Sequence, residues 1–331
     1  MSAQKVIIDC DPGIDDALAL VFARGHPDLE VLGITTVAGN VGLGQTTANA
    51  LQVRDYLTMP DVPVVAGSPG PLLRPALDAR DVHGSSGLGA ASLPAPSSGP
   101  ADGHAVDYLA AAIGAEPGQV TLIAIGPLTN IALAVRRYPR LVTQVRDFVI
   151  MGGSAGRGNV TPAAEFNIAA DPEAAAIVFG AGWTVTMVGL DVTLRARATA
   201  AVRDRMRGLG RLAADLLLPS LSGYRGASRG AGPAASPPGQ PAAPDGPAVH
   251  DVCAVAAVAA PGLLTWAPAR VEVETAGRLT AGMTVTDFTA PASDCNARVA
   301  VGIDADAFWD LVLDAYGRAA AQMGPPGISR P

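Results

Sequence analysis

Residues 6–16 read Val-Ile-Ile-Asp-Cys-Asp-Pro-Gly-Ile-Asp-Asp, and they give the clearest local indication of the fold. The apolar run at its start is rich in β-branched residues, which is typical of a buried strand. Pro12 and Gly13 then force a turn. Asp15 and Asp16 open a helix, where the helix dipole favours negative charge. The stretch therefore predicts a strand that passes through a tight turn directly into a helix.

The same alternation of strand and helix continues along the chain. Strands rich in Val and Ile are predicted at 6–8, 31–37, 120–125, 148–151 and 184–190. Helices are predicted at 15–24, 44–57, 104–114, 128–137, 172–180 and 199–217. After residue 250 we expect a helix at 251–260, hairpin strands at 270–275 and 283–288, a strand at 297–303 and a helix at 304–323. The alternation predicts a single α/β domain over residues 1–331, with a mostly parallel, Rossmann-like central sheet and helices on both faces.

Residues 225–249 differ in kind from the rest of the chain. They hold five glycines and six prolines in 25 positions. This composition does not bury a core, so we expect a mobile loop. One interpretation is a disordered surface insertion. The other is an active-site lid, because the segment leads directly into His250 and Asp251.

Charge and composition exclude several classes of protein. The chain has 30 acidic and 23 basic residues, a net charge of −7, and only 16% charged residues. Without a basic block, nucleic-acid binding by phosphate neutralisation is not expected. Three cysteines do not make a disulfide framework. The charged residue Lys5 directly before Val6 predicts no signal peptide, and the apolar runs at 174–181 and 254–264 are shorter than a bilayer span. We therefore expect a cytoplasmic protein with no membrane association.

Four carboxylates fall within eight residues at the end of the first predicted strand: Asp9, Asp11, Asp15 and Asp16. Asp9 and Asp11 are two apart, so on a strand they point the same way. A helix dipole offsets one or two charges, but not four converging beside a buried strand end. A bound cation offsets them, and oxygen ligands select Ca²⁺ or Mg²⁺ rather than zinc. The alternative is helix capping plus solvated acids.

A metal-bound aspartate cluster fits more than one reaction. Haloacid dehalogenase-like phosphatases place Asp-x-Asp-Gly-Thr here and need a downstream lysine. In this chain Pro12 follows Asp11, and the only lysine, Lys5, lies upstream. The composition therefore favours metal-assisted hydrolysis, in which a carboxylate takes a proton from an activated water. A metal-dependent phosphohydrolase remains as an alternative.

Further polar residues follow the other predicted strands and the Gly/Pro-rich loop. They include Asn40, Asn159, Glu165, Asn167, His250 and Asp251. Ligands of a parallel sheet bind at the carboxyl ends of its strands, so we expect these side chains around one crevice. Amides and carboxylates in this number suit a ligand with many hydroxyl groups, which suggests a sugar.

The segments occur in an order that resembles the inosine–uridine-preferring nucleoside hydrolases, from Val6 to roughly residue 316. The motif Asp-x-Asp-Pro-Gly-x-Asp-Asp at residues 9–16 carries the resemblance most specifically. The resemblance implies the nucleoside hydrolase fold and hydrolysis of the N-glycosidic bond of ribonucleosides, giving free base and ribose. It also implies Ca²⁺ as cofactor, a homodimer or homotetramer, and a place in purine or pyrimidine salvage. The non-enzyme alternative is a nucleoside- or ribose-binding protein that has kept the fold.

The resemblance also implies roles for individual residues. Those that would bind Ca²⁺ are Asp11, Asp16, Asp251 and the backbone carbonyl of Ile125. Those that would bind substrate are Asp15, Asn40, His83, Met151, Asn159, Glu165 and Asn167. Asp11 would also be the general base for a metal-bound water, with Asp9 supporting the cluster, and His250 would assist departure of the base. The other two histidines, His26 and His104, are expected at the surface.

Overall fold

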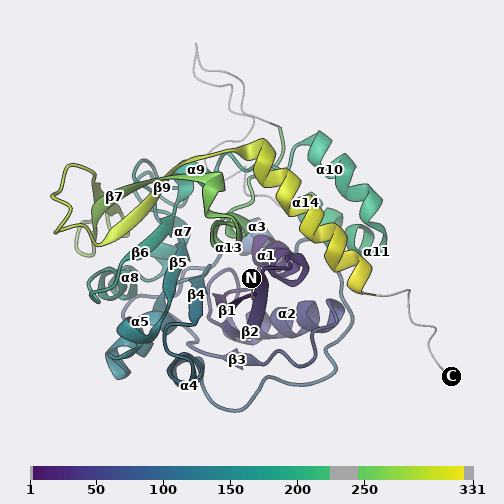
Figure 1. Cartoon of the computed structure of the whole chain (residues 1–331), viewed down its shortest axis with the longest axis horizontal. Coiled ribbons are helices and arrows are strands. Elements are labelled where there is room, and N and C mark those ends of the chain that lie inside the picture. Colours follow the sequence, from purple (N-terminus) through teal and green to yellow (C-terminus); the bar gives the residue numbers. More distant parts are fainter. Residues whose placement is uncertain (1–2, 224–244, 324–331) are drawn as a thin grey trace, which may run out of the picture.

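The strand predicted at the head of the chain is β1 (Gln4–Cys10), and it lies inside the central sheet of the computed structural model (Figure 1). The structure describes residues 3–223 and 245–323. In these ranges the sheet has nine strands in the order β3-β2-β1-β4-β5-β6-β9-β7-β8. The other strands are β2 (Leu29–Thr36), β3 (Val64–Ala66), β4 (Val120–Ala124), β5 (Asp147–Met151), β6 (Val185–Val188), β7 (Leu264–Val273), β8 (Thr284–Asp287) and β9 (Ala297–Ile303).

Most neighbouring strands run parallel, as the sequence predicts. The pairs from β3 across to β9 are all parallel, whereas β7 pairs antiparallel with β9 and with β8. The antiparallel β7 and β8 are the predicted hairpin. β3 was not predicted, because three residues are too short to show a periodicity.

Both faces of the sheet are covered, which follows from the side-chain alternation along β1. Val6 and Ile8 belong to one buried core cluster, and Ile7 between them belongs to the other. The first cluster lies under α1 (Ile14–Gly25), α2 (Leu43–Tyr56), α13 (Asp251–Ala259) and α14 (Ala305–Gln322). The second lies under α4 (Ala105–Ala115), α5 (Thr129–Arg137) and α8 (Pro172–Phe179). Figure 1 shows the two groups on opposite sides of the strands.

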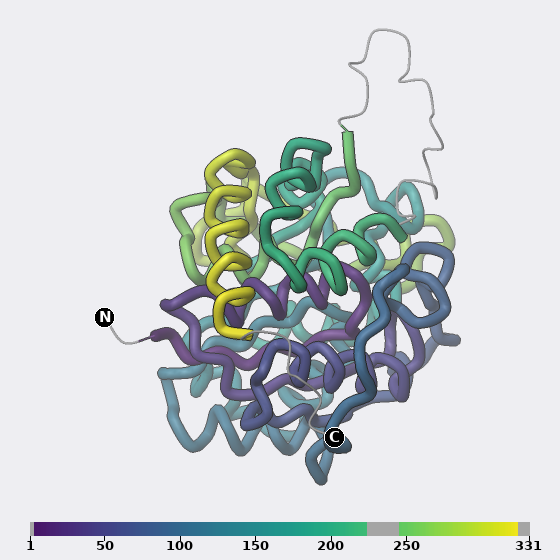
Figure 2. Tube along the Cα trace, turned by 90° about the vertical axis from the view of Figure 1, so that its right-hand side faces the viewer, coloured from purple at the N-terminus to yellow at the C-terminus, as the bar shows by residue number. Residues whose placement is uncertain are grey.

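The single helix predicted at 199–217 is wrong. This segment is α10 (Ala200–Met206), η1 (Arg207–Leu209), α11 (Gly210–Leu212) and η2 (Ala213–Leu217), followed by α12 (Leu218–Gly223). The break occurs at Gly210, whose φ of 59° lies in the left-handed region that glycine tolerates. Figure 2 shows this run of short turns beside α14, which it contacts through α10, η1 and α11.

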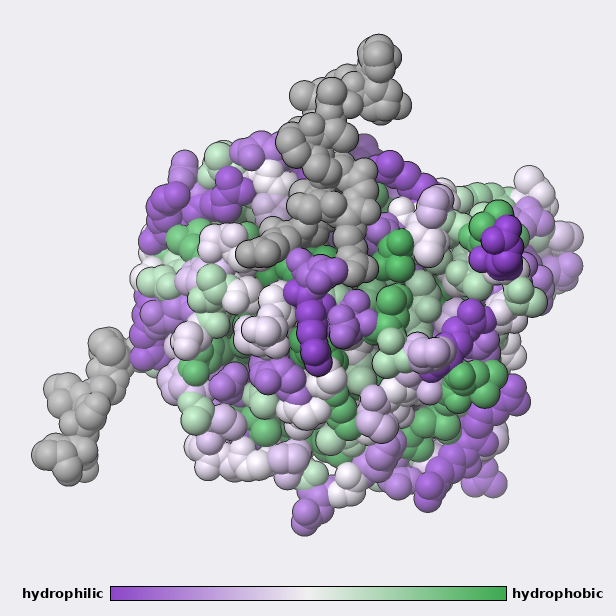
Figure 3. All heavy atoms as spheres, turned by 180° about the vertical axis from the view of Figure 1, so that it is seen from behind, coloured by the Kyte–Doolittle hydropathy of each residue, from purple (hydrophilic) through white to green (hydrophobic). Residues whose placement is uncertain are grey.

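Shorter helices complete the described chain: α3 (Arg80–His83), α6 (Leu141–Gln144), α7 (Phe166–Ala170), α9 (Leu190–Thr193) and η3 (Pro261–Leu263). None of the helices in residues 3–223 and 245–323 has the length and apolarity that crossing a bilayer requires. On the face shown in Figure 3, hydrophilic and hydrophobic side chains are interspersed.

The structure leaves the predicted mobile loop untested and corrects the predicted surface position of His26. Most of the predicted mobile loop, 225–244, lies outside the described residues, so its two interpretations stay predictions. His26, expected at the surface, is only 8% exposed. Its ring lies 5.3 Å from that of Phe22, and α14 packs across α1 beside it. The local sequence did not indicate α14, which lies almost 300 residues away in the chain.

Candidate active site

The acidic motif leaves β1 at the carboxyl edge of the sheet, between the ends of β2 and β4. Asp11, Asp15 and Asp16 are buried there, with exposed fractions of 0%, 6% and 0%. Asp251 joins them because α13 begins at this residue and packs against α1. Carboxylate oxygens of Asp15, Asp16 and Asp251 lie within 4.8 Å of one another. Residues more than 230 positions apart in the sequence thus form one acidic cluster.

Helix capping accounts for only one member of this cluster. Asp16 accepts hydrogen bonds from the backbone N–H groups of Asp11 (3.1 Å) and Gly13 (2.9 Å), which closes the turn before α1. Asn40 adds a side-chain hydrogen bond to Asp16 of 3.1 Å. The carboxylates of Asp11 and Asp251 lie outside this turn, so the capping alternative does not explain the set.

The two carboxylate oxygens of Asp11 differ in their hydrogen bonding. One oxygen, Oδ2, accepts a hydrogen bond of 2.6 Å from the backbone N–H of Asn40. The other, Oδ1, is buried and has no hydrogen-bond partner among the described residues. Two glycines allow the close approach, because a Cβ at Gly126 would lie 2.6 Å from Oδ1 and one at Gly39 would collide with Oδ2. A buried, unpartnered carboxylate oxygen is the donor atom that a cation requires.

Burial and mutual repulsion disfavour ionisation across the cluster. Burial, reinforced by the charge of Asp15, raises the pKa of Asp16 to about 7. Burial and the charge of Asp16 raise the pKa of Asp11 well above its usual range. Burial, with the charges of Asp15 and Asp16, does the same to the pKa of Asp251. A divalent cation reverses these shifts, because it favours the charged form of each ligand. The donor set is all oxygen, so the cluster fits a hard cation.

Two predicted metal ligands, Asp11 and the carbonyl of Ile125, are not part of the compact group of three carboxylates. That group contains Asp15, which was expected to bind ribose, and does not contain Asp11. The backbone carbonyl of Ile125 accepts a hydrogen bond of 2.9 Å from Asn167. A carbonyl oxygen has two lone pairs, so the second one stays available to a cation. Met151, whose carbonyl accepts from the same amide at 3.0 Å, is buried beside Asn167.

Asp9 supports the cluster from within β1. Its Oδ1 accepts hydrogen bonds from the Thr35 hydroxyl and, at 2.8 Å, from the Asn130 amide. Burial raises the pKa of Asp9 to about 7, and these two hydrogen bonds oppose the rise. Thr35 was not predicted as a site residue, although it follows the pattern of polar residues at or after a strand end.

Glu165 holds the loop that follows β5. Its carboxylate accepts from the backbone N–H groups of Gly153 (2.9 Å), Asn167 (2.9 Å) and Ile168 (3.2 Å), so it also caps α7. Burial raises the pKa of Glu165 to about 7, against the effect of these donors. Asn159 is exposed, and its Oδ1 accepts a hydrogen bond of 3.0 Å from Phe166. This loop therefore presents Asn159 at the rim and Glu165 in the interior.

Two histidines face the acidic cluster. His83 is buried, and its Nδ1 accepts a hydrogen bond of 3.0 Å from the backbone N–H of Ile14. In the neutral ring the proton is then on Nε2. Nδ1 of His250 lies 2.8 Å from the hydroxyl of Thr193. Burial lowers the pKa of both histidines, and the charge of Asp15 acts to raise both. The two rings and Asp15 therefore share one region.

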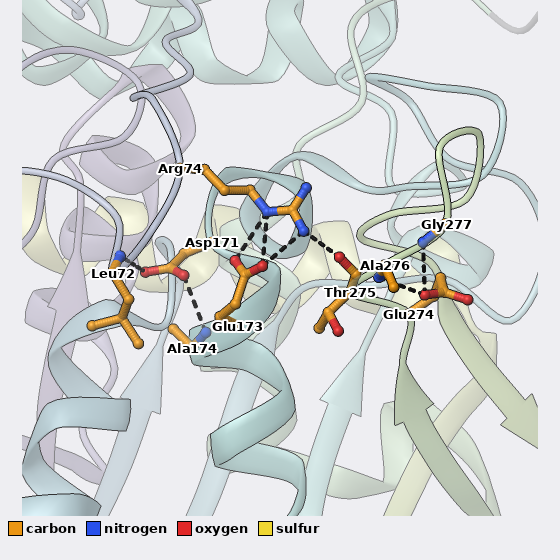
Figure 4. Close-up of polar contacts among 9 residues, drawn as sticks. All are labelled: Leu72, Arg74, Asp171, Glu173, Ala174, Glu274, Thr275, Ala276 and Gly277. Carbon is orange, nitrogen blue, oxygen red and sulfur yellow. Dashed lines mark hydrogen bonds and ion pairs between the residues drawn. The ribbon is translucent and has the colours of Figure 1, made fainter.

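The loop at residues 69–79 is tied to the start of α8 and to the residues that follow β7 (Figure 4). Arg74 donates to both carboxylate oxygens of Glu173, at 2.7–3.0 Å, and to the carbonyl of Thr275. Asp171 accepts from the backbone N–H of Leu72 (2.8 Å) and caps α8. The loop ends at a backbone hydrogen bond of 3.1 Å to the carbonyl of Asn40. It then continues into α3, the helix that carries His83.

Comparison with known proteins agrees with this geometry. The family model for inosine-uridine preferring nucleoside hydrolase matches residues 6–310. The chain is 45% identical over 318 residues to an inosine-uridine preferring nucleoside hydrolase of Leishmania major, covering 95% of this chain and 98% of that protein. It is 42% identical over 317 residues to a pyrimidine-specific ribonucleoside hydrolase of Salmonella schwarzengrund, covering 94% and 98%.

The fold agrees as well. The structure of a purine-preferring ribonucleoside hydrolase from Gardnerella vaginalis matches with a TM-score of 0.85 and 31% identity, over 96% of this chain and 99% of that one. The predicted resemblance and the predicted α/β fold with a mostly parallel central sheet are therefore confirmed. The family is metal-dependent, and the acidic cluster supplies ligands of the required kind. The chain belongs to the inosine-uridine preferring nucleoside hydrolases, glycosidases that act on the N-glycosyl bonds of nucleosides.

Proposed function

We propose that this enzyme is Ca²⁺-dependent and hydrolyses ribonucleosides to free base and ribose through the residues of the acidic cluster and His250. One observation carries the proposal. A buried carboxylate oxygen of Asp11 has no hydrogen-bond partner among the described residues, and it lies in the acidic region that His83 and His250 also face. Family membership supports the reaction class, whereas the metal and the roles of the residues are part of the proposal.

The ligands of the cation would be Asp11, Asp16, Asp251 and the carbonyl of Ile125. Three carboxylates and one carbonyl suit Ca²⁺, which accepts many oxygen ligands in flexible geometry, better than Mg²⁺, which keeps most of its waters. When bound, the cation supplies positive charge that acidifies water and attracts sugar hydroxyls. The three aspartates are buried, so this charge acts in a region of low dielectric.

Asp11 is the residue that takes the proton of the attacking water. Its open oxygen accepts the proton, while the N–H of Asn40 holds the other oxygen in place. C–N cleavage runs ahead of water attack, so the ribosyl group becomes oxocarbenium-like. The surrounding carboxylates stabilise that positive charge because they are fixed before the reaction begins.

The ribose hydroxyls would be bound by polar side chains on both sides of the acidic cluster. These are Asp15, Asn40, Asn159, Glu165 and Asn167, with Met151 packed against the sugar. Glu165 and Asn167 are fixed by backbone hydrogen bonds at the start of α7, so they offer a rigid surface. The exposed Asn159 closes this surface at its rim.

Departure of the base requires a proton or hydrogen bonds on a nitrogen that becomes negative. His250 would donate the proton, because it lies beside Asp15 at the start of α13. His83, whose Nδ1 accepts from Ile14, would lie near the base. The names of the relatives include inosine-uridine preferring, pyrimidine-specific and purine-preferring enzymes, so both classes of base belong in the assay.

The biological setting is also proposed from the family. We propose a homodimer or homotetramer in the cytoplasm that serves salvage of purines or pyrimidines. Size-exclusion chromatography with light scattering tests the oligomeric state.

A direct assay tests the function. Chelator-treated enzyme is incubated with inosine, uridine or ribose 5-phosphate, with and without added Ca²⁺, and reducing sugar and phosphate are measured. We expect reducing sugar from at least one nucleoside, and only with Ca²⁺. Activity restored by Mg²⁺ but not by Ca²⁺ would contradict the proposed metal. Phosphate release, or tight nucleoside binding without turnover, would contradict the proposed reaction.

A second assay tests the proton donor. His250→Ala is compared with the unaltered enzyme on inosine and on 4-nitrophenyl riboside, whose phenolate leaves without protonation. We expect a loss of about 100-fold or more in kcat on inosine and a small change on the aryl riboside. An equal loss on both substrates would show that His250 does not protonate the leaving group.

A further inference from the structure

A buried threonine lies against the ring of His250, and neither the sequence motifs nor the family comparison assigns it a role. Thr193 is the last residue of α9, the short helix that follows the carboxyl end of β6. It is 0% exposed. Its Oγ1 lies 2.8 Å from Nδ1 of His250, which is 57 positions away in the sequence. The hydroxyl thus contacts the ring nitrogen by which the imidazole can be oriented.

We propose that Thr193 is a positioning residue, whose hydroxyl donates a hydrogen bond to Nδ1 of His250 and thereby keeps the ring proton on Nε2. This inference rests on the proposed role of His250 as proton donor. A neutral imidazole has one nitrogen that donates and one that accepts, and the partner of the accepting nitrogen decides which is which. With Nδ1 accepting from Thr193, the neutral ring presents Nε2–H, so it meets the departing base with a hydrogen-bond donor rather than an acceptor.

The backbone before His250 is fixed by the same part of the chain. Val249 donates to the carbonyl of Ala196 at 2.9 Å, and Ala198 donates to the carbonyl of Pro247 at 2.8 Å. The segment after α9 therefore holds the main chain, while Thr193 at the end of α9 holds the ring. On the other side, the N–H of His250 lies 3.4 Å from Oδ2 of Asp15. Backbone hydrogen bonds thus fix the position of His250, and the contact with Thr193 fixes the rotation of its ring.

The helix α9 is itself anchored to the loop after β5. Asp191, two residues before Thr193, accepts a hydrogen bond of 2.8 Å from the backbone N–H of Ala155. It also lies 3.4 Å from the hydroxyl of Ser154. Since Glu165 holds Gly153 in the same loop, α9 connects the proposed ribose surface to the proposed proton donor. A rigid support of this kind is what a catalytic side chain needs to keep its geometry.

Two substitutions separate the hydroxyl from the packing of the side chain. Thr193→Val keeps the shape and removes the donor, so the ring proton can move to Nδ1 and leave Nε2 as an acceptor. Thr193→Ser keeps the hydroxyl and loses one methyl group. We therefore expect Thr193→Val to impair proton donation and Thr193→Ser to restore most of it.

The test uses the full chain supplied with Ca²⁺, and measures kcat and KM on inosine or uridine and on 4-nitrophenyl riboside. For Thr193→Val we expect kcat on the nucleoside to fall about 10- to 100-fold, with KM and the aryl riboside changed less than about threefold. For Thr193→Ser we expect kcat within about threefold of the unaltered enzyme. Equal losses on both substrates, or equal losses in the two variants, would overturn the inference.

The His250→Ala variant distinguishes failure of this inference from failure of the proposed function. If His250→Ala is selective for the nucleoside and Thr193→Val is not, only the role of Thr193 is wrong. If His250→Ala is not selective, the proposed proton donor is wrong, and the role of Thr193 is wrong with it.

A spectroscopic measurement tests the tautomer without using activity. The chain has four histidines, so ¹⁵N-labelled imidazole signals are few, and that of His250 is the one missing from His250→Ala. We expect the Nε2–H tautomer of His250 in the unaltered enzyme and a shift toward Nδ1–H in Thr193→Val. An Nδ1–H tautomer in the unaltered enzyme would overturn the inference, even if Thr193→Val does not fold.

Discussion

Asp11 and Asp16 lie five residues apart in one motif but do different work. Both carboxylate oxygens of Asp16 accept hydrogen bonds from backbone N–H groups of the turn that joins β1 to α1. Asp11 keeps one oxygen open beside Gly126, whose missing side chain leaves room for it. This difference in hydrogen bonding supports the proposal that both residues bind the cation but that only Asp11 accepts a proton from water.

The first prediction concerns Asp11. Asp11→Asn keeps the size of the side chain but removes a negative charge and the proton acceptor. We expect kcat to fall at least about 100-fold and Ca²⁺ binding, measured by calorimetry, to weaken. Asp102→Asn, a change of the same kind at an exposed residue, is the control and should match the unaltered enzyme. A kcat for Asp11→Asn within about tenfold of normal at saturating Ca²⁺ would refute the general-base role.

At the scale of elements, α1 is unusual because it is buried nearly all round. The sheet lies beneath it and α13 and α14 pack against it. A helix that is apolar on every side belongs inside a core. This packing fixes the position of Asp15 and Asp16, which lie in the first turn of α1 at the carboxyl edge of the sheet.

The second prediction tests the contact between α1 and α14. A Cβ at Gly25 would collide with the backbone carbonyl of Ala315 in α14. We expect Gly25→Ala to lower the free energy of unfolding by about 1–3 kcal/mol, because backbone cannot move aside cheaply. Gly44→Ala is the matched control, since nothing lies within 4 Å of the added Cβ near the start of α2. It should be neutral or stabilising by up to about 1 kcal/mol in the same urea titration.

The third prediction concerns the anchors of the 69–79 loop. Asp171 is 0% exposed and accepts from Leu72, Thr129 and Ala174, so Asp171→Ala leaves three donors without their partner. We expect a loss of roughly 2–4 kcal/mol in the free energy of unfolding. The side chains of Arg74 and Glu173 are 33% and 20% exposed, and solvent screens their attraction. Arg74→Ala should cost about 1 kcal/mol or less. The reverse order of the two variants would contradict this assignment of the anchors.

At the scale of the whole molecule, the buried acids couple stability to pH and to metal. Burial raises the pKa values of Asp9, Asp16 and Glu165 to about 7, whereas an unfolded carboxylic acid titrates near about 4. Between these values the folded protein binds more protons than the unfolded chain. The free energy of unfolding of the metal-free protein therefore falls as the pH rises from about 4 to about 7.

The fourth prediction follows from this linkage. Added Ca²⁺ binds the ionised carboxylates of the folded state, so it competes with protons and stabilises more strongly at high pH. We expect the rise in Tm caused by Ca²⁺ to be larger at pH 8 than at pH 5. Thermal unfolding with chelator and with Ca²⁺ at the two pH values measures it. An equal rise at both values would show that the raised carboxylates do not bind the cation.

The sequence predicted much of this molecule because its strongest signals are local. The motif at residues 9–16 is contiguous, so its charge density and its turn are visible without any other part of the chain. Buried parallel strands also carry their own signal as runs of Val and Ile. β3 was not predicted because it is only three residues long. The helix predicted at 199–217 was wrong because one isolated glycine, Gly210, does not by itself indicate a break.

The sequence alone was enough to predict the α/β class, the oxygen-donor chemistry of the acidic motif and the resemblance to the family. Which residues meet became visible only in the folded chain. It places Asp251 against Asp16, buries His26 beside α14 and brings Thr193 to the ring of His250. The physical reason is that side-chain periodicity reports which face of an element is buried, but not which distant element covers it. Contacts between residues far apart in the chain exist only once the sheet and its helices have packed together.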